Sequence, residues 1–259
     1  MSNFVYKKID FSHKVGTIDF LDDDYGEHIH YFYEIIFFVD GDVKYTVQSE
    51  TRKLSPGNII LIQPGKVHFC DIKNNQNYER YVVKFQESLL PDYLKNALLK
   101  SPSFFNKTKK YSYIFEKIDD YLLNYKDEEL YTLLICELLR LCIFLKNEKT
   151  DVLNQKNEFL DQVIEYIDEH IYENISTKKL SEVFYYSPSY IDYEFKTEMK
   201  MSITKYVKKK KIYLANQLVK NGMKVNEAAE KVGFKDYSTF YRSYIKVMGS
   251  KPSESKNKF

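Results

Sequence analysis

The alternation of hydrophobic and polar positions divides the chain into a strand-rich first part and a helical remainder. Up to about residue 85, short apolar runs are separated by turn signals that contain Gly or Pro. The clearest is the Asp-Gly pair at 40–41, which lies between two β-rich runs and predicts a tight hairpin. The predicted strands cover residues 32–39, 43–47, 58–62, 67–72 and 79–85. Many short strands joined by such turns indicate a β-sandwich or a small barrel.

After residue 110 the apolar positions recur at helical spacing, which predicts helices over 114–125 and 130–145. The second helix carries an apolar stripe at 134, 138, 141 and 145, wider than an exposed helix tolerates. The stripe suits either packing against the β domain or a subunit interface. We take the interface as the working interpretation, under which Leu138→Glu with Leu141→Glu gives a folded monomer.

A polar, weakly patterned segment at 146–157 reads as a linker, and helical patterns resume at Phe159 and continue nearly to the end. The predicted fold class is therefore α+β. We expect a β-rich domain over 1–110, a helical dimerisation connector with its linker over 111–157, and an all-α domain over 158–259.

The charge is distributed unevenly along the chain. The 259 residues carry a formal net charge of only +2, but residues 155–259 hold 19 Lys+Arg against 14 Asp+Glu. From Met201 onward the numbers are 14 and 4. Such asymmetry indicates a polyanion-binding end, and its alternative is a solvated lysine-rich face.

Cysteine usage and the N-terminus indicate a cytoplasmic protein. Three cysteines give neither a disulfide framework nor a zinc-finger spacing and favour a reducing compartment. The first ten residues lack the apolar core of a signal peptide. The most apolar stretch, 130–145, contains Glu137 and Arg140 and is shorter than the ~20 residues of a bilayer span, so we expect no membrane partner.

The last hundred residues contain a helix-turn-helix pattern twice. In the first, a helix at 180–183 and a turn near 185–186 precede Ser187 and Pro188, which suit the N-cap and first position of the next helix. In the second, Ala228-Ala229, Gly233 and Asp236 supply a first helix, a tight turn and an N-cap. A helix over 205–221 joins them.

Apolar anchors decide which side chains of the two second helices face outward. With Ile191 and Phe195 inside, the exposed set of the first unit is Ser189, Asp192, Tyr193 and Lys196. With Phe240 and Tyr244 inside, that of the second is Ser238, Tyr241, Arg242 and Ile245. We expect both sets to contact DNA, except Ile245, and we expect Lys211 of the 208–211 lysine run to contact a phosphate. A solvated surface is the alternative for each.

The run EAAEKVGFKDYSTFYRSYIKVMGSKPSE and the upstream LSEVFYYSPSYIDYEFKTEM resemble the two motifs of the AraC/XylS family of transcription regulators. The resemblance implies two helix-turn-helix units that enter adjacent major-groove segments of double-stranded DNA. Three positions depart from the pattern. Tyr185 lies where the second motif has Gly233, Lys200 where the family often has glycine, and Lys211 where it commonly has arginine.

In the β-rich part, His28, His30 and Glu34 followed by Gly41 resemble the first motif of cupin barrels. Gly57, Pro64-Gly65 and His68 resemble the second, with altered spacing. Such barrels often serve this family as sensors, so the resemblance implies that His28, His30, Glu34 and His68 bind an effector. In metal cupins the same ligand types hold Zn, Mn, Fe or Ni. We expect a small polar, sugar-like or carboxylated effector and no metal or other cofactor; a purely structural role stays open.

These patterns predict a ligand-responsive, sequence-specific transcription regulator, an activator, that acts as a homodimer, contacts RNA polymerase and is not an enzyme. No nucleophilic triad, P-loop or dinucleotide fingerprint is visible in the sequence. Two alternatives stay open. One is a cupin metalloenzyme with an accessory DNA-binding tail, and the other is a ligand-independent regulator whose barrel only dimerises.

Overall fold

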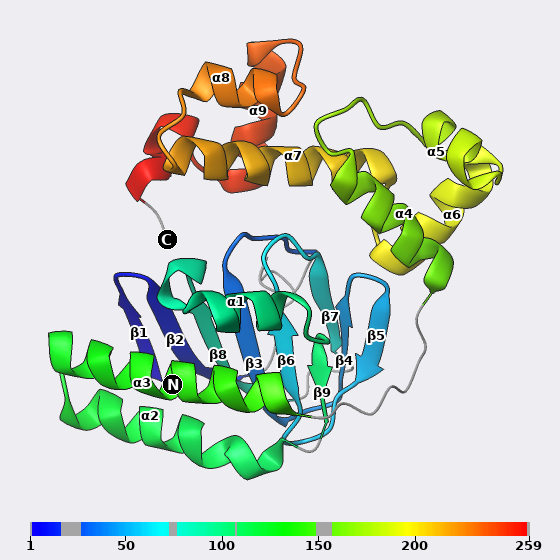
Figure 1. The fold of residues 1–259 in the computed structure, drawn as a ribbon. Coiled ribbons are helices and arrows are strands. Elements are labelled where there is room, and N and C mark those ends of the chain that lie inside the picture. The colour runs from blue at the N-terminus through cyan, green and yellow to red at the C-terminus, as the bar shows by residue number, and fades with distance from the viewer. Residues whose placement is uncertain (1, 17–26, 73–76, 107, 149–156, 258–259) are drawn as a thin grey trace. The chain divides into compact units, whose positions relative to one another are not determined.

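The computed structural model describes residues 2–16, 27–72, 77–106, 108–148 and 157–257. It divides into two compact units, the first built mainly from residues 1–154 and the second mainly from residues 155–259. The first is a β domain with three α-helices, and the second consists of helices (Figure 1). The α+β class predicted from the sequence is confirmed.

The β domain consists of two sheets. Its strands are β1 (Ser2–Tyr6), β2 (Ile9–Lys14), β3 (Tyr33–Asp40), β4 (Val43–Val47), β5 (Glu50–Lys53), β6 (Ile59–Ile62), β7 (His68–Ile72), β8 (Glu79–Phe85) and β9 (Phe104–Phe105). One sheet has the order β1-β2-β8-β3-β6-β9 and the other the order β5-β4-β7. The β3–β4 hairpin turns at Gly41, whose φ of +135° suits glycine.

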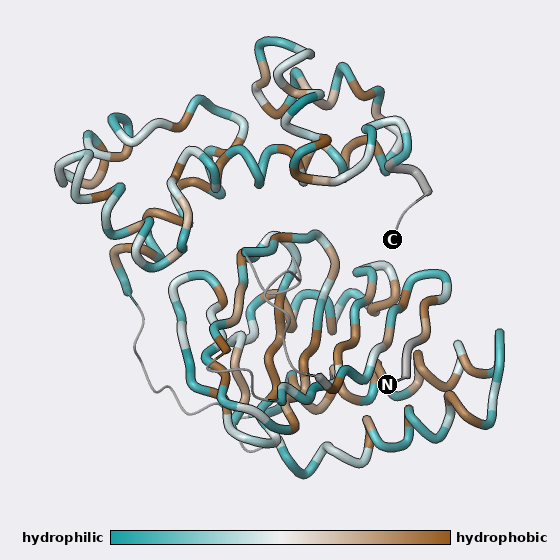
Figure 2. The backbone as a smooth tube through the Cα atoms, turned by 180° about the vertical axis from the view of Figure 1, so that it is seen from behind, coloured by the Kyte–Doolittle hydropathy of each residue, from teal (hydrophilic) through white to brown (hydrophobic). Residues whose placement is uncertain are grey.

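The central strand β3 is buried on both faces because its alternate side chains enter two different cores. Ile36 and Phe38 pack with Val43 and Tyr45 of β4 in a core shared by the two sheets. Ile35 and Phe37 belong to a second core on the opposite face. Figure 2 shows hydrophobic positions along the strands of this unit. The continuous apolar run of β3 is therefore explained by cores that cover this strand on both faces.

Three helices cover that opposite face of the larger sheet: α1 (Asp92–Leu99), α2 (Ser112–Asn124) and α3 (Asp127–Asn147). Short 3-10 turns, η2 (Glu87–Leu89) and η3 (Lys109–Tyr111), precede α1 and α2. Residues 111–147 therefore pack as part of the first unit.

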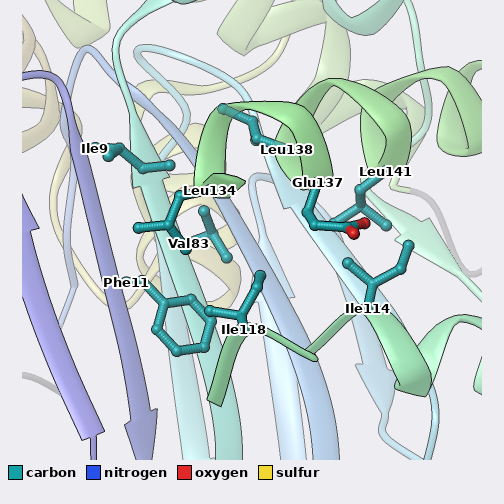
Figure 3. Close-up of a pocket in the computed structure, with 9 residues that line it drawn as sticks. All are labelled: Ile9, Phe11, Val83, Ile114, Ile118, Leu134, Glu137, Leu138 and Leu141. Atoms are coloured by element: carbon teal, nitrogen blue, oxygen red, sulfur yellow. The ribbon is translucent and has the colours of Figure 1, made fainter. Parts of the chain in front are cut away.

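The apolar stripe of α3 is buried within the chain, which corrects the interface interpretation. Leu134, Leu138, Leu141 and Leu145 are each at most 2% exposed. Figure 3 shows the first three beside Ile9, Phe11 and Val83 of the sheet and Ile114 and Ile118 of α2, around a cavity of only about 10 Å³. Packing against the sheet, one of the two arrangements that the sequence left open, satisfies the stripe without a second subunit.

Glu137 is the polar member of this core, and its carboxylate is satisfied locally. The Tyr121 hydroxyl donates to it at 3.3 Å, and the Arg140 guanidinium donates at 3.3 Å. Arg140 also donates to the Tyr113 hydroxyl at 2.7 Å, so the pair ties α3 to α2. A buried carboxylate held by such partners is tolerated in a core.

The second unit has α4 (Glu158–Glu169), α5 (Thr177–Phe184), α6 (Pro188–Met199), α7 (Ile203–Lys220), α8 (Val225–Lys231), α9 (Tyr237–Met248) and a 3-10 turn, η4 (Pro252–Asn257). Figure 1 shows α5 and α6 at one end of α7 and α8 and α9 at its other end. None of the helices in the described residues is long and apolar enough to cross a membrane.

Candidate nucleic-acid interface and effector site

The first helix-turn-helix unit consists of α5 and α6, and its second helix begins as the sequence predicts. The Ser187 hydroxyl accepts a hydrogen bond from the Tyr190 backbone N–H at 3.2 Å, and Pro188 is the first helical residue. Ile191 and Phe195 are buried, and the Phe195 ring contacts Tyr206 of α7 edge-on at 5.1 Å. This packing fixes α6 on the linking helix with its other face outward. The four predicted DNA-contacting residues of this helix, Ser189, Asp192, Tyr193 and Lys196, are all exposed.

The turn of this unit places a tyrosine in a backbone conformation that favours glycine. Tyr185 ends α5 with a φ of +59°, and its side chain is 92% exposed. The Ser181 hydroxyl closes the turn by donating to the Tyr186 carbonyl at 2.6 Å. The backbone at Tyr185 is thus left-handed, as it is at Gly233, whose φ is +84°.

We predict that Tyr185→Gly raises the free energy of unfolding of the helical domain that contains α4 to α9. A non-glycine residue in this region costs about 1–2 kcal/mol, partly offset by the greater unfolded-state entropy of glycine, so a net gain of up to ~1 kcal/mol is expected. Tyr185→Ala removes the same ring and keeps the strain, so it should give no gain. Urea unfolding followed by helical circular dichroism compares them, and equal stability of the two variants would contradict the prediction.

The second helix-turn-helix unit consists of α8 and α9 and repeats the arrangement. The Asp236 carboxylate accepts from the Thr239 N–H at 2.6 Å, and hydrogen bonds from Thr239 lower the pKa of Asp236. Phe240 and Tyr244 are buried, and the Tyr244 hydroxyl donates to the Asn216 side-chain oxygen of α7 at 2.8 Å. The outward set is Ser238 and Arg242, both exposed, with Tyr241 half-buried beside them.

The lysine run 208–211 is not one surface. Lys208 is exposed, Lys209 is half-buried, and Lys210 and Lys211 are buried. Lys210 pairs with Asp168 of α4, and burial lowers its pKa. Lys211 donates to the Glu173 carbonyl oxygen at 2.8 Å, and burial also lowers its pKa. Its ammonium group points into the domain, which corrects the expectation that Lys211 contacts a DNA phosphate.

In the β domain, Glu34 of β3 and His68 of β7 come together although they are 34 positions apart in the sequence. Both are buried, and Glu34 Oε2 lies 3.5 Å from His68 Nε2. One ligand atom each from His30, Glu34 and His68 lies within 4.8 Å of the others. His28 is half-buried and is not a member of this group. The structure thus brings three of the four predicted effector residues together.

The histidine tautomer shows what this site accepts. His68 Nδ1 lies 3.1 Å from the Lys66 carbonyl oxygen, which only accepts, so this nitrogen carries the proton. A neutral His68 therefore directs the lone pair of Nε2 toward the Glu34 carboxylate. A proton, a donor group of a ligand or a cation between the two atoms relieves that repulsion. Two imidazoles and a carboxylate are a donor set that suits Zn, Mn, Fe or Ni, so these residues fit a metal as well as a polar ligand.

Two family models match the chain: "AraC-like ligand binding domain" over residues 16–143 and "Helix-turn-helix domain" over residues 180–258. The chain belongs to the AraC family of transcription regulators. The probable transcriptional regulator LumQ of Photobacterium leiognathi is 25% identical over 91% of this chain and 94% of its own length. The uncharacterized HTH-type regulator YijO of Escherichia coli is 22% identical over 57% and 53%. Apo ToxT K231A from Vibrio cholerae is a solved structure similar over 96% and 97% of the two chains, with 11% identity and a TM-score of 0.44.

This AraC-family chain is a ligand-responsive DNA-binding transcription regulator. Its ligand-binding domain contains inward-facing residues that sequence reasoning missed. Arg80 of β8 is buried, and its guanidinium lies 4.0 Å from the centre of the Tyr78 ring. Tyr45 stacks on His68 at 6.3 Å, and burial raises its pKa well above the usual value. The alternation of β8, with Arg80 and Val82 on one face, was the signal that could have found Arg80.

Two cysteines of this domain, Cys70 and Cys142, are poor candidates for nucleophilic chemistry. Burial raises the pKa of the Cys70 thiol, which faces the same interior, to about 12. It raises that of the Cys142 thiol in α3 to about 12 as well. Both groups are therefore protonated at neutral pH, where a thiolate would be needed for attack on a substrate.

Proposed function

We propose that this AraC-family regulator is an activator that binds double-stranded DNA through α6 and α9. A small polar effector is recognised at His30, Glu34 and His68. The observation that carries the proposal is the pair of helix-turn-helix units mounted on one helix, each with a buried anchor face and an exposed polar face. The cluster of one carboxylate and two imidazoles in the ligand-binding domain supports the effector half.

The length of the linking helix supports binding to adjacent major-groove segments. The 18 residues of α7 span about 27 Å at a rise of 1.5 Å per residue. Successive major-groove segments on one side of B-DNA are about 34 Å apart, so units mounted near the ends of such a helix reach both. Selection of duplexes from randomised DNA, followed by footprinting, tests this. Two protected segments one helical turn apart are expected, and a single short footprint would contradict the proposal.

The effector site makes the next prediction. Glu34→Gln keeps the shape of the side chain but removes the charge that attracts a donor or cation, so it should abolish most of the effector response while DNA affinity stays within about twofold. Glu116→Gln, on the exposed face of α2, is the matched control. A panel of sugars and small carboxylates, screened by thermal shift, supplies the ligand, and reporter induction measures the response.

If the response survives alanine at His30, Glu34 and His68 together, the effector binds elsewhere. The donor set also favours a second candidate function, a metal-dependent activity of a cupin-like domain. Metal analysis of protein purified without a polyhistidine tag distinguishes the two. Near-stoichiometric metal favours the metal-dependent activity, and its absence favours the polar effector.

We further propose that the regulator acts as a homodimer in the cytoplasm and contacts RNA polymerase. With the inner stripe of α3 buried, the surface for self-association is the row beside it, where Ile135 and Leu139 lie at the edge of the core and are half-buried and Ile143 is exposed. A row of partly exposed apolar side chains next to the buried stripe supports the proposal that a second copy of the chain packs against this helix. Light scattering of the purified chain at micromolar concentration tests the dimer.

A further inference from the structure

Three segments of the DNA-binding unit converge on Lys211 in the middle of α7. The first is the end of the α4 region, where the Glu173 carbonyl oxygen accepts a hydrogen bond from Lys211 Nζ at 2.8 Å. The second is α7 itself, in which Lys211 is only 8% exposed. The third is the turn between α8 and α9, where Gly233 lies against the same ammonium group. Lys211 therefore touches both halves of this domain, where the first half is α4, the loop after it and the first helix-turn-helix unit, and the second half is α8 and α9.

The contact with Gly233 depends on the absence of a side chain. A Cβ at this position would lie 3.0 Å from Lys211 Nζ and 3.1 Å from the Tyr172 carbonyl oxygen, closer than ordinary van der Waals contact. The φ of +84° independently favours glycine. Glycine thus lets the turn between α8 and α9 approach the backbone of the loop between α4 and α5, and the lysine ammonium group lies where they meet.

Beside this contact the two halves are separated by a cleft. Its volume is about 170 Å³, and it is lined by Asn174 and Ile175 after α4, by Lys208 and Lys211 of α7, and by Gly233 and Phe234 of the second turn. Each half packs on α7 through its own anchors, Phe195 on Tyr206 and Tyr244 on Asn216. Lys211 lines this cleft and links the loop between α4 and α5 to the turn between α8 and α9.

We propose that Lys211, together with Gly233, is a positioning residue that sets the separation of the two recognition helices and so makes the protein select the spacing between two half-sites in DNA. The inference rests on the proposed use of both units on one duplex. A single helix leaves the units at its ends free to bend and rotate. A buried charged donor that bonds the loop leading into the first unit and packs against the turn of the second removes part of that freedom. This raises the effective concentration of the second unit once the first is bound.

The experiment starts from a bipartite duplex that the wild-type chain selects from randomised DNA. Affinities are measured for this duplex, for each half-site alone, and for versions with one base pair inserted or deleted between the half-sites. The variants are Lys211→Met, which keeps an unbranched side chain without a donor, and Gly233→Ala, which keeps the lysine but inserts a Cβ at the contact. Lys208→Met, from the same cleft and the same helix but with an exposed side chain, is the matched control.

Lys211→Met should weaken binding to the bipartite duplex about tenfold, leave half-site binding within about twofold, and reduce the penalty for altered spacing. Lys208→Met should leave the spacing penalty unchanged. Equal losses on half-sites and bipartite DNA, with an unchanged spacing penalty, would overturn the inference. If circular dichroism shows that Lys211→Met is unfolded, Gly233→Ala decides by the same criteria. A wild-type chain that selects no duplex would instead refute the proposed DNA-binding mode.

Discussion

Leu138→Glu is expected to unfold the ligand-binding domain, not to release a folded monomer. Leu138 is 2% exposed and faces the sheet with Leu134 and Leu141 (Figure 3). The cavity at this place is too small for a carboxylate and its hydration, so the substitution removes apolar contacts and buries a charge without a partner. The cost is several kcal/mol, a large part of the ~5–15 kcal/mol by which domains are stable.

Ile143→Glu is the matched control, because it introduces the same charge on the same helix at a residue that is 39% exposed. It should leave the urea midpoint nearly unchanged. If the partly exposed row of α3 pairs two chains, it should also shift the mass in light scattering from dimer to monomer. A Leu138→Glu protein with a wild-type unfolding curve would mean that the stripe is not buried in the chain.

This contrast illustrates which part of the fold the sequence predicts. Periodicity identifies the apolar face of α3, because that depends only on helix geometry and residue type. It does not identify the partner of that face, because packing against the sheet and packing against another subunit remove the same area from water. The strands show a further limit of sequence patterns. Five strands were predicted from the turn signals that flank them. β1 and β2 were missed because the turn between them has neither Gly nor Pro, and Lys7 takes the left-handed conformation, with a φ of +52°.

In the two helix-turn-helix units, the sequence predicts more of the structure, because helix caps depend on residues close together in the chain. Ser187 and Asp236 cap their helices as expected, because a cap needs only a hydroxyl or carboxylate at the right offset. In the lysine run 208–211, Lys211 was expected to face outward and contact a phosphate, but helix geometry lets only some of these four residues face outward. Four successive residues turn through 100° each and surround the helix, so some must point inward. Lys210 and Lys211 do so, and their partners come from α4 and the residues after it, which no local pattern of α7 reveals.

In the β domain, strand alternation predicts which residues point inward but not which of them meet. Glu34 and His68 lie on strands of different sheets, and their approach depends on how the sheets pack. The motif resemblance supplied the pair because it encodes that packing. The resemblance also predicted His28 as a site residue, but His28 is outside the group of ligand atoms. Where the spacing of a motif is altered, each of its residues must therefore be checked separately.

Arg242→Ala should have the largest effect on sequence recognition. Arg242 is the only arginine after residue 140, and it is exposed on the outward face of α9, where its Nε–H donates to the Ser238 carbonyl at 3.3 Å. Within the described part of the chain this guanidinium bonds through Nε, so its terminal nitrogens can donate as a fork to guanine O6 and N7, which lysine cannot imitate. The corresponding residue of α6 is Tyr193. Its neighbour Asp192 has a carboxylate that phosphates repel and that can accept a hydrogen bond from a base such as cytosine.

The second unit should therefore discriminate between sequences more strongly than the first. Arg242→Ala is expected to cost about 1–3 kcal/mol on the selected duplex and to relax the preference at one base pair, with random DNA nearly unaffected. Lys246→Ala, an exposed cation on the same helix, is the matched control and should weaken all duplexes alike while flattening the salt dependence. Titrations over single-base variants of the duplex at two salt concentrations separate these outcomes. If Arg242→Ala weakens selected and random DNA by the same factor, the arginine contacts a phosphate, because a contact with the backbone lowers affinity without changing the order in which sequences are preferred.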